Sequence, residues 1–122
     1  MNMTIAELAE ASKSAPYDEK RKNIYLKMAR RFLVQLGKEL GLDPNDCDVR
    51  TNRAGIAVAG DVTLHHERIY ISLGDCFGGM LGLVRSCQGR KDYTGGQNNP
   101  IMEHSTNEWL LKRCRELLQA AA

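Results

Sequence analysis

Residues 88–100 form a polar, glycine-rich segment whose side chains could bind an anionic ligand or an acidic protein surface. Exposed glycine amides, arginine and lysine charges, a tyrosine ring and amide side chains suit phosphate or carboxylate groups. The charged side chains would steer a partner, and the tyrosine would supply the largest contact area. The candidate binding residues in and beside this segment are Arg85, Arg90, Lys91, Asp92, Tyr93 and Gln97.

The same segment contains no established phosphate-binding signature. The pattern G-x-x-x-x-G-K-[ST] is absent, and Gly95-Gly96 is not followed by G-x-x-G. A long solvated loop stabilised by turn chemistry is therefore an equal alternative to a binding site. Loops of this length are nevertheless often functional.

A second group of basic residues lies between residues 17 and 40. Lys20, Lys27, Arg31 and Lys38 fall on one side of a helix of 3.6 residues per turn. Such a face could follow a phosphate backbone or dock on an acidic protein groove, although a solvated outer face is the simpler interpretation. We take Lys27, Arg30 and Arg31 as a second candidate binding surface.

Cysteine and histidine side chains raise two further possibilities, catalysis and metal binding. Cys87 or Cys76 could act as a nucleophile if the fold brought His65, His66 or His104 alongside as a base. Cys87 is the better candidate because it precedes the glycine-rich segment. Structural zinc sites usually have ligands in close pairs, and this chain has no C-x-x-C pair. We therefore expect no metal and no cofactor, and an enzyme is the less favoured hypothesis.

Helices are predicted in the N-terminal third of the chain. Thr4 and Glu7 have the spacing of a capping box, so we expect a short helix over residues 5–12. Residues 17–40 predict the longest helix, which Gly41 should end. Its apolar residues recur every four positions and are Ile24, Met28, Phe32, Leu36 and Leu40, flanked by Tyr25, Ala29 and Leu33.

The pattern then changes to a period of two residues, which predicts strands. Residues 49–52 and 80–87 each predict one strand, and two runs joined at residues 65–68 predict an antiparallel hairpin with one buried face. The buried parity is expected to hold Ile56, Val58, Val62 and Leu64, and the opposite parity Asp61, Thr63 and His65.

A C-terminal helix over residues 106–121 completes the predicted fold, with a second capping box at Ser105 and Glu108. We expect one α+β domain over residues 1–122 in the order ααββββα. Its antiparallel sheet of three or four strands should carry the N-terminal helices and the C-terminal helix on one face.

Length and composition favour a globular cytoplasmic protein. The chain has 122 residues with 43% hydrophobic and 26% charged residues, and no apolar run approaches the roughly 20 residues that span a bilayer. The N-terminus has no secretory signal pattern. The net charge of +2 is too small to indicate a partner by itself.

Two strings, GDVTLH at residues 60–65 and CQGRKDYTGG at residues 87–96, resemble small uncharacterised accessory proteins of phages and other mobile elements. This resemblance implies a protein that binds and blocks host machinery, such as a CRISPR effector complex. Our leading hypothesis is a small non-enzymatic binding protein that docks on a host protein or nucleoprotein complex. The alternatives are a nucleic-acid-binding protein that uses the basic helix and loop, and a small enzyme built around Cys87.

Overall fold

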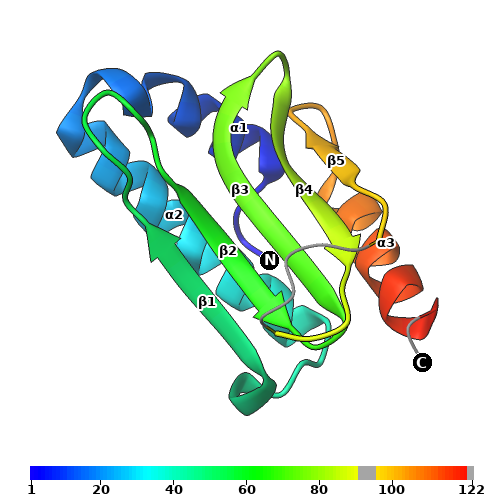
Figure 1. Cartoon of the computed structure of the whole chain (residues 1–122). Coiled ribbons are helices and arrows are strands. Elements are labelled where there is room, and N and C mark those ends of the chain that lie inside the picture. The colour runs from blue at the N-terminus through cyan, green and yellow to red at the C-terminus, as the bar shows by residue number, and fades with distance from the viewer. Residues whose placement is uncertain (91–95, 121–122) are drawn as a thin grey trace.

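In residues 1–90 and 96–120, which the computed structural model describes, five strands form an antiparallel sheet (Figure 1). Each strand pairs with the next along the chain, so the connections can be short hairpins or loops. The strands are β1 (Cys47–Asn52), β2 (Asp61–His66), β3 (Ile69–Phe77), β4 (Met80–Ser86) and β5 (Asn99–Met102).

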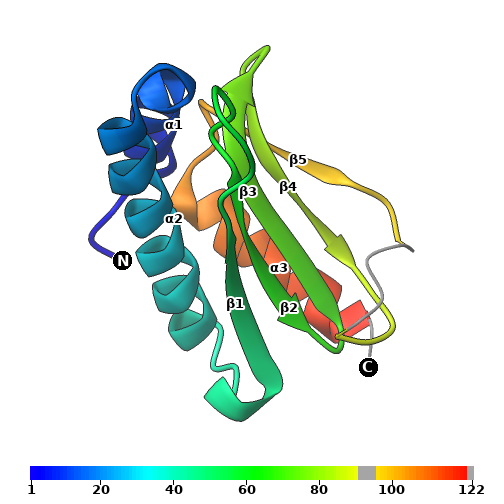
Figure 2. The same cartoon turned by 60° about the vertical axis from the view of Figure 1, so that its left-hand side comes forward.

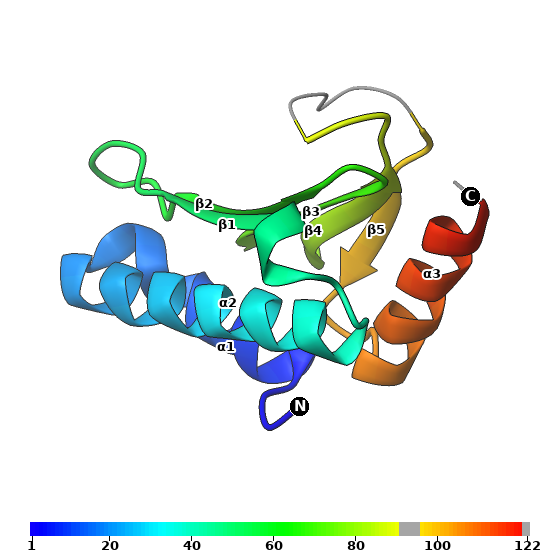
Figure 3. The ribbon, with the colours of Figure 1, turned by 90° about the horizontal axis from the view of Figure 1, so that it is seen from below.

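Three α-helices cover one face of this sheet and leave the other face open (Figure 3). They are α1 (Ile5–Ser14), α2 (Glu19–Glu39) and α3 (Asn107–Ala120), with short 3₁₀ helices at Ala15–Tyr17 and Pro44–Asp46. This arrangement confirms the α+β class and the packing of helices on one face. None of these helices offers an apolar stretch of the length that a membrane crossing needs.

The hydrophobic core lies between the helices and the covered face of the sheet. Its members are fully or almost fully buried, and each contributes about 1.5–3 kcal/mol relative to an exposed position. The strands supply Val62, Leu64, Ile69, Ile71, Leu73, Leu81, Val84 and Ile101, and α2 supplies Tyr25, Phe32, Leu33 and Leu36.

Helix boundaries follow local capping, with one correction. Thr4 and Glu7 form the predicted capping box of α1, and Gly41 at φ 73° follows the end of α2. At α3, however, Thr106 rather than Ser105 caps the helix, because its hydroxyl oxygen accepts the amide of Trp109 at 3.0 Å. The Ser105 hydroxyl instead accepts the Met102 amide at 3.0 Å.

The buried side of α2 is rotated from the predicted one. Ile24 is 48% exposed, whereas Lys22 is buried and donates to the Gly55 carbonyl oxygen at 3.0 Å. A row with a spacing of four residues drifts by about 40° per step around a helix, so it cannot stay on one face. The core instead uses the mixed spacing of three and four that runs from Tyr25 to Leu36.

Residues 53–60 form a loop rather than the first half of the predicted hairpin. Ala54, Ala57 and Gly60 all have positive φ, which breaks the extended backbone. Ile56 is consequently 96% exposed instead of buried. The strand begins only at Asp61, after these turns.

Strand β5 lies where the sequence predicts the end of a loop, which raises the strand count to five. Pro100 pairs in register with Leu83 of β4. Proline is tolerated in an edge strand because one side of such a strand has no neighbouring strand that would accept an amide hydrogen bond. The side chain of Asn99 donates to the Val84 carbonyl oxygen at 3.1 Å and accepts from Arg113 Nε at 2.8 Å. These bonds tie β5 to both β4 and α3.

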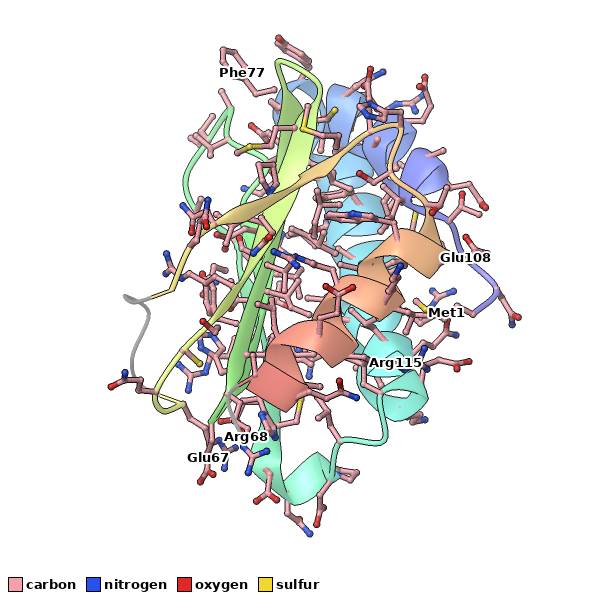
Figure 4. The ribbon with its side chains drawn as sticks, turned by 90° about the vertical axis from the view of Figure 1, so that its right-hand side faces the viewer. Met1, Glu67, Arg68, Phe77, Glu108 and Arg115 are labelled. Atoms are coloured by element: carbon pink, nitrogen blue, oxygen red, sulfur yellow. The ribbon has the colours of Figure 1, made fainter. Side chains whose placement is uncertain are left out.

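The two ends of the sheet differ in what they carry. Figure 4 shows Phe77, at the β3–β4 turn, at one end and Glu67 and Arg68, at the β2–β3 turn, at the other. The Cys87 amide donates to the Arg68 carbonyl oxygen at 3.1 Å. The chain that follows β4 therefore starts beside the β2–β3 turn.

Candidate binding surface on the open face of the sheet

Four polar side chains form a row across the open face of the sheet, one from each of β1 to β4. Asp48 is paired in register with His65, His65 with Tyr70, and Tyr70 with Arg85. Directly opposite residues of antiparallel strands have side chains close enough to interact. We call Asp48, His65, Tyr70 and Arg85 the transverse row.

Arg85 is held in place by an aromatic ring and an amide. Its guanidinium carbon lies 4.8 Å from the centre of the Tyr70 ring, a distance typical of a cation–π contact. Its Nη1 donates to the side-chain oxygen of Asn98 at 3.2 Å, and its buried Nε has no hydrogen-bond partner. Within the described residues no carboxylate pairs with Arg85, so the contacts described here position its charge without neutralising it.

His65 is the most enclosed member of the row. It is 4% exposed, its ring meets that of Tyr70 edge-on at 5.3 Å, and its Nε2 lies 2.8 Å from Thr63 Oγ1. Burial lowers the pKa of this imidazole, and the nearby charge of Arg50 lowers it further. The neutral form of His65 is therefore favoured. Thr63, which the sequence pattern placed on the face opposite the core, is also buried.

Arg90 connects the chain after β4 to the far edge of the sheet. Its Nη2 lies 2.7 Å from Asp48 Oδ1, and its Nη1 donates to the Asn45 carbonyl oxygen at 3.1 Å. Arg50 Nη2 is 3.6 Å from the other oxygen of Asp48. The segment between Cys87 and Arg90 thus lies over the face that the helices leave open (Figure 3).

The structure divides the predicted binding residues between two surfaces. Arg85 and Arg90 lie on the open face of the sheet, and exposed Gln97 follows in the same connection. Lys27, Arg30 and Arg31 lie on α2, in the helical layer on the other side. Three further candidates, Lys91, Asp92 and Tyr93, lie outside the described residues.

Arg30 differs from its neighbours on α2, because its Nη1 donates to the Val49 carbonyl oxygen at 2.7 Å. This bond joins α2 to β1 and gives Arg30 a structural role. Lys27 and Arg31 are exposed.

Sequence reasoning missed Asp48, His65 and Tyr70 as members of the surface. The alternation of residues 68–73 already separates Tyr70 from the apolar parity. Which residues face it across the strands depends on the pairing register, and no local pattern in the sequence states that register.

Two cysteine thiols donate hydrogen bonds to oxygen atoms. The Cys87 thiol donates to the backbone carbonyl oxygen of His66 at 3.1 Å. The Cys76 thiol donates to Glu103 Oε2 at 3.3 Å, and burial together with this carboxylate raises its pKa. Burial raises the pKa of Cys114 to about 12. Within residues 1–90 and 96–120, no cluster of three or more histidine, cysteine or acidic side chains could hold a metal ion.

Comparison with known proteins brings no further identification. No protein-family model matches the chain, and neither curated proteins nor solved structures match it.

Proposed function

We propose that the protein is a small non-enzymatic binding protein that docks on a protein or nucleoprotein partner through the open face of its sheet. The observation that carries this proposal is the set of contacts made by the Arg85 guanidinium. Its guanidinium is held against Tyr70 and Asn98 while no described carboxylate neutralises its charge. A guanidinium held in this way is pre-positioned to form an ion pair with an acidic group on a partner.

The composition of the row also supports docking. Arginine and tyrosine are enriched among the residues that contribute most to protein–protein affinity. The two side chains already contact each other, so less side-chain freedom remains to be lost on binding. Arg90, in contrast, is already paired with Asp48 and would contribute less than Arg85.

The proposed setting is the cytoplasm of a cell that carries the mobile element. The resemblance of residues 60–65 and 87–96 to accessory proteins of such elements implies inhibition of a host complex, such as a CRISPR effector. Docking alone would inhibit if it covered a surface that the complex needs.

A pull-down from host lysate tests this proposal. The tagged protein is compared with Arg85→Ala and with Lys112→Ala, which removes one exposed charge from α3, at low and high salt and with and without nuclease. We expect a defined partner that survives salt and nuclease treatment. Its recovery should fall about tenfold with Arg85→Ala and stay unchanged with Lys112→Ala.

Unchanged recovery with a correctly folded Arg85→Ala variant would show that the open face is not the docking site. Capture that disappears with nuclease would instead indicate that the protein binds nucleic acid directly. Circular dichroism of each variant separates loss of binding from loss of folding.

A further inference from the structure

The outer side of α2 carries a second charged surface. Four cations lie on it with two aliphatic side chains between them, and all six are exposed. At 100° per residue the cations fall within about 40° of one another, and the surface is about 27 Å long. Figure 2 shows that α2 lies along the sheet with one side turned away from it. This basic ridge consists of Lys20, Ile24, Lys27, Arg31, Val34 and Lys38.

The acidic residues of α2 and its N-cap form ion pairs elsewhere. Asp18 Oδ2 lies 3.9 Å from Arg21 Nε, and Glu19 Oε1 lies 3.1 Å from Arg53 Nη2. Glu39 Oε1 lies 3.6 Å from the N-terminal amine. None of the ion pairs among the described residues involves a cation of the basic ridge, so its positive charge is available to a partner.

Two features of the ridge are unfavourable for the protein alone. Lys27 and Arg31 are four residues apart on a helix, where like charges repel. Ile24 is 48% exposed and Val34 is 37% exposed, so both leave apolar surface in water. A partner that brought both carboxylates and apolar side chains would relieve both costs at once.

We propose that the basic ridge is a docking surface for an acidic protein segment with apolar side chains, such as an acidic amphipathic helix. Complementary charge would orient the two helices, while Ile24 and Val34 would pack against the apolar side chains of the partner. A partner helix of about 18 residues matches the length of the ridge.

Nucleic acid fits the ridge less well than such a protein. A phosphate backbone would use the four cations but would gain nothing from Ile24 and Val34. The ridge also has no aromatic side chain on which a base could stack. The two exposed aliphatic residues therefore favour the protein partner.

This second surface goes beyond the docking site on the sheet. The basic ridge belongs to the helical layer, and the transverse row belongs to the opposite, open face of the sheet (Figure 3). One partner on each side could be bound at the same time.

Fluorescence anisotropy with three defined probes tests the proposal. The first is an 18-residue helical peptide with glutamates on one side and leucines at spacings of three and four. The second has the same charge but glutamine in place of leucine, and the third is a 20-base-pair DNA duplex. We expect the leucine peptide to bind about tenfold more tightly than the glutamine peptide.

Variants of the ridge separate charge from apolar contact. Ile24→Gln with Val34→Gln should abolish the preference for the leucine peptide and leave binding of the glutamine peptide unchanged. Lys27→Glu with Arg31→Glu should weaken both peptides, whereas Lys112→Glu with Arg68→Glu, two exposed cations outside the ridge, should weaken neither. Far-UV circular dichroism establishes that each variant is folded.

Three outcomes would overturn the proposal. Equal affinity for the two peptides would mean that the ridge only attracts negative charge. Tighter binding of the duplex, insensitive to the Ile24 and Val34 changes, would identify a nucleic-acid surface instead. Failure of folded wild-type protein to bind any probe would remove the docking surface altogether, without bearing on Arg85.

Discussion

At the scale of single residues, the ability of the open face to bind an acidic partner depends on which of its cations are already ion-paired. Arg90 and Arg85 lie in or beside the same connection, yet Arg90 meets the Asp48 carboxylate at 2.7 Å while Arg85 meets a ring and an amide. Partly exposed ion pairs contribute little to stability, about 0–1 kcal/mol. The Arg90 pair is therefore best understood as a contact that positions the chain after β4.

His65 should make the stability of the protein depend on pH. Its pKa in the folded protein is lowered from 6.5 by burial, so below pH 6.5 the unfolded chain binds more protons than the folded one. The free energy of unfolding should therefore fall as the pH decreases through this range. Urea unfolding between pH 7.5 and 5.0 should show a smaller decrease for His65→Gln than for the wild type.

His104→Gln is the matched control for this experiment, because His104 is exposed. His104→Gln removes an imidazole that lies outside the transverse row. If His65→Gln retains the pH dependence of the wild type, His65 is not the group responsible.

At the scale of elements, β4 links the core to the candidate surface. Leu81 and Val84 face the core, while Arg85 joins the transverse row on the other side. Gly82, which lies between Leu81 and Val84 in β4, pairs with Leu73 of β3 on one side and Ile101 of β5 on the other. The strand can approach β3 closely here because residue 82 has no side chain.

Gly82→Ala should destabilise the protein by about 1–3 kcal/mol, the usual cost of forcing an extra group into packed structure. A Cβ at this position would overlap the carbonyl oxygen of Ser72, which is backbone and cannot rotate away. Gly89→Ala is the control, because a Cβ at residue 89 would meet no atom of the described residues within 4 Å. Equal unfolding midpoints for the two variants in urea would contradict this account of β4.

At the scale of the whole molecule, the layered architecture separates two basic surfaces. The helices and the core lie between the outer side of α2 and the open face of the sheet (Figure 3). Residues on opposite sides of a core, with no partner in common among the described residues, usually act independently.

Arg85→Ala should therefore leave the affinity of the leucine peptide for the basic ridge within about twofold of the wild-type value. Lys27→Glu with Arg31→Glu should likewise leave capture through the open face unchanged. Anisotropy and pull-down measure these two effects separately. A large loss of peptide affinity with folded Arg85→Ala would mean that the surfaces are coupled through the fold.

Local features of the sequence were enough to predict the α+β class, the three helices and most of the strands. Capping at Thr4, the glycine stop at Gly41 and the alternation of residues 69–73 act over a few residues, and the structure confirms all three. Strand β5 was missed, because the composition of residues 88–100 predicts one loop and an isolated sequence does not show which segment forms the edge of a sheet.

The candidate surface, in contrast, depends on contacts between residues far apart in the chain. Register brings Asp48, His65, Tyr70 and Arg85 into one row, and the fold pairs Arg90 with Asp48 while Arg85 meets no carboxylate of residues 1–90 and 96–120. The buried side of α2 was likewise settled by packing against the sheet. The sequence by itself determined which elements form, because propensity and capping are local. Only the tertiary structure decided which side chains meet and which charges remain available, because strand pairing and burial depend on residues far apart in the chain.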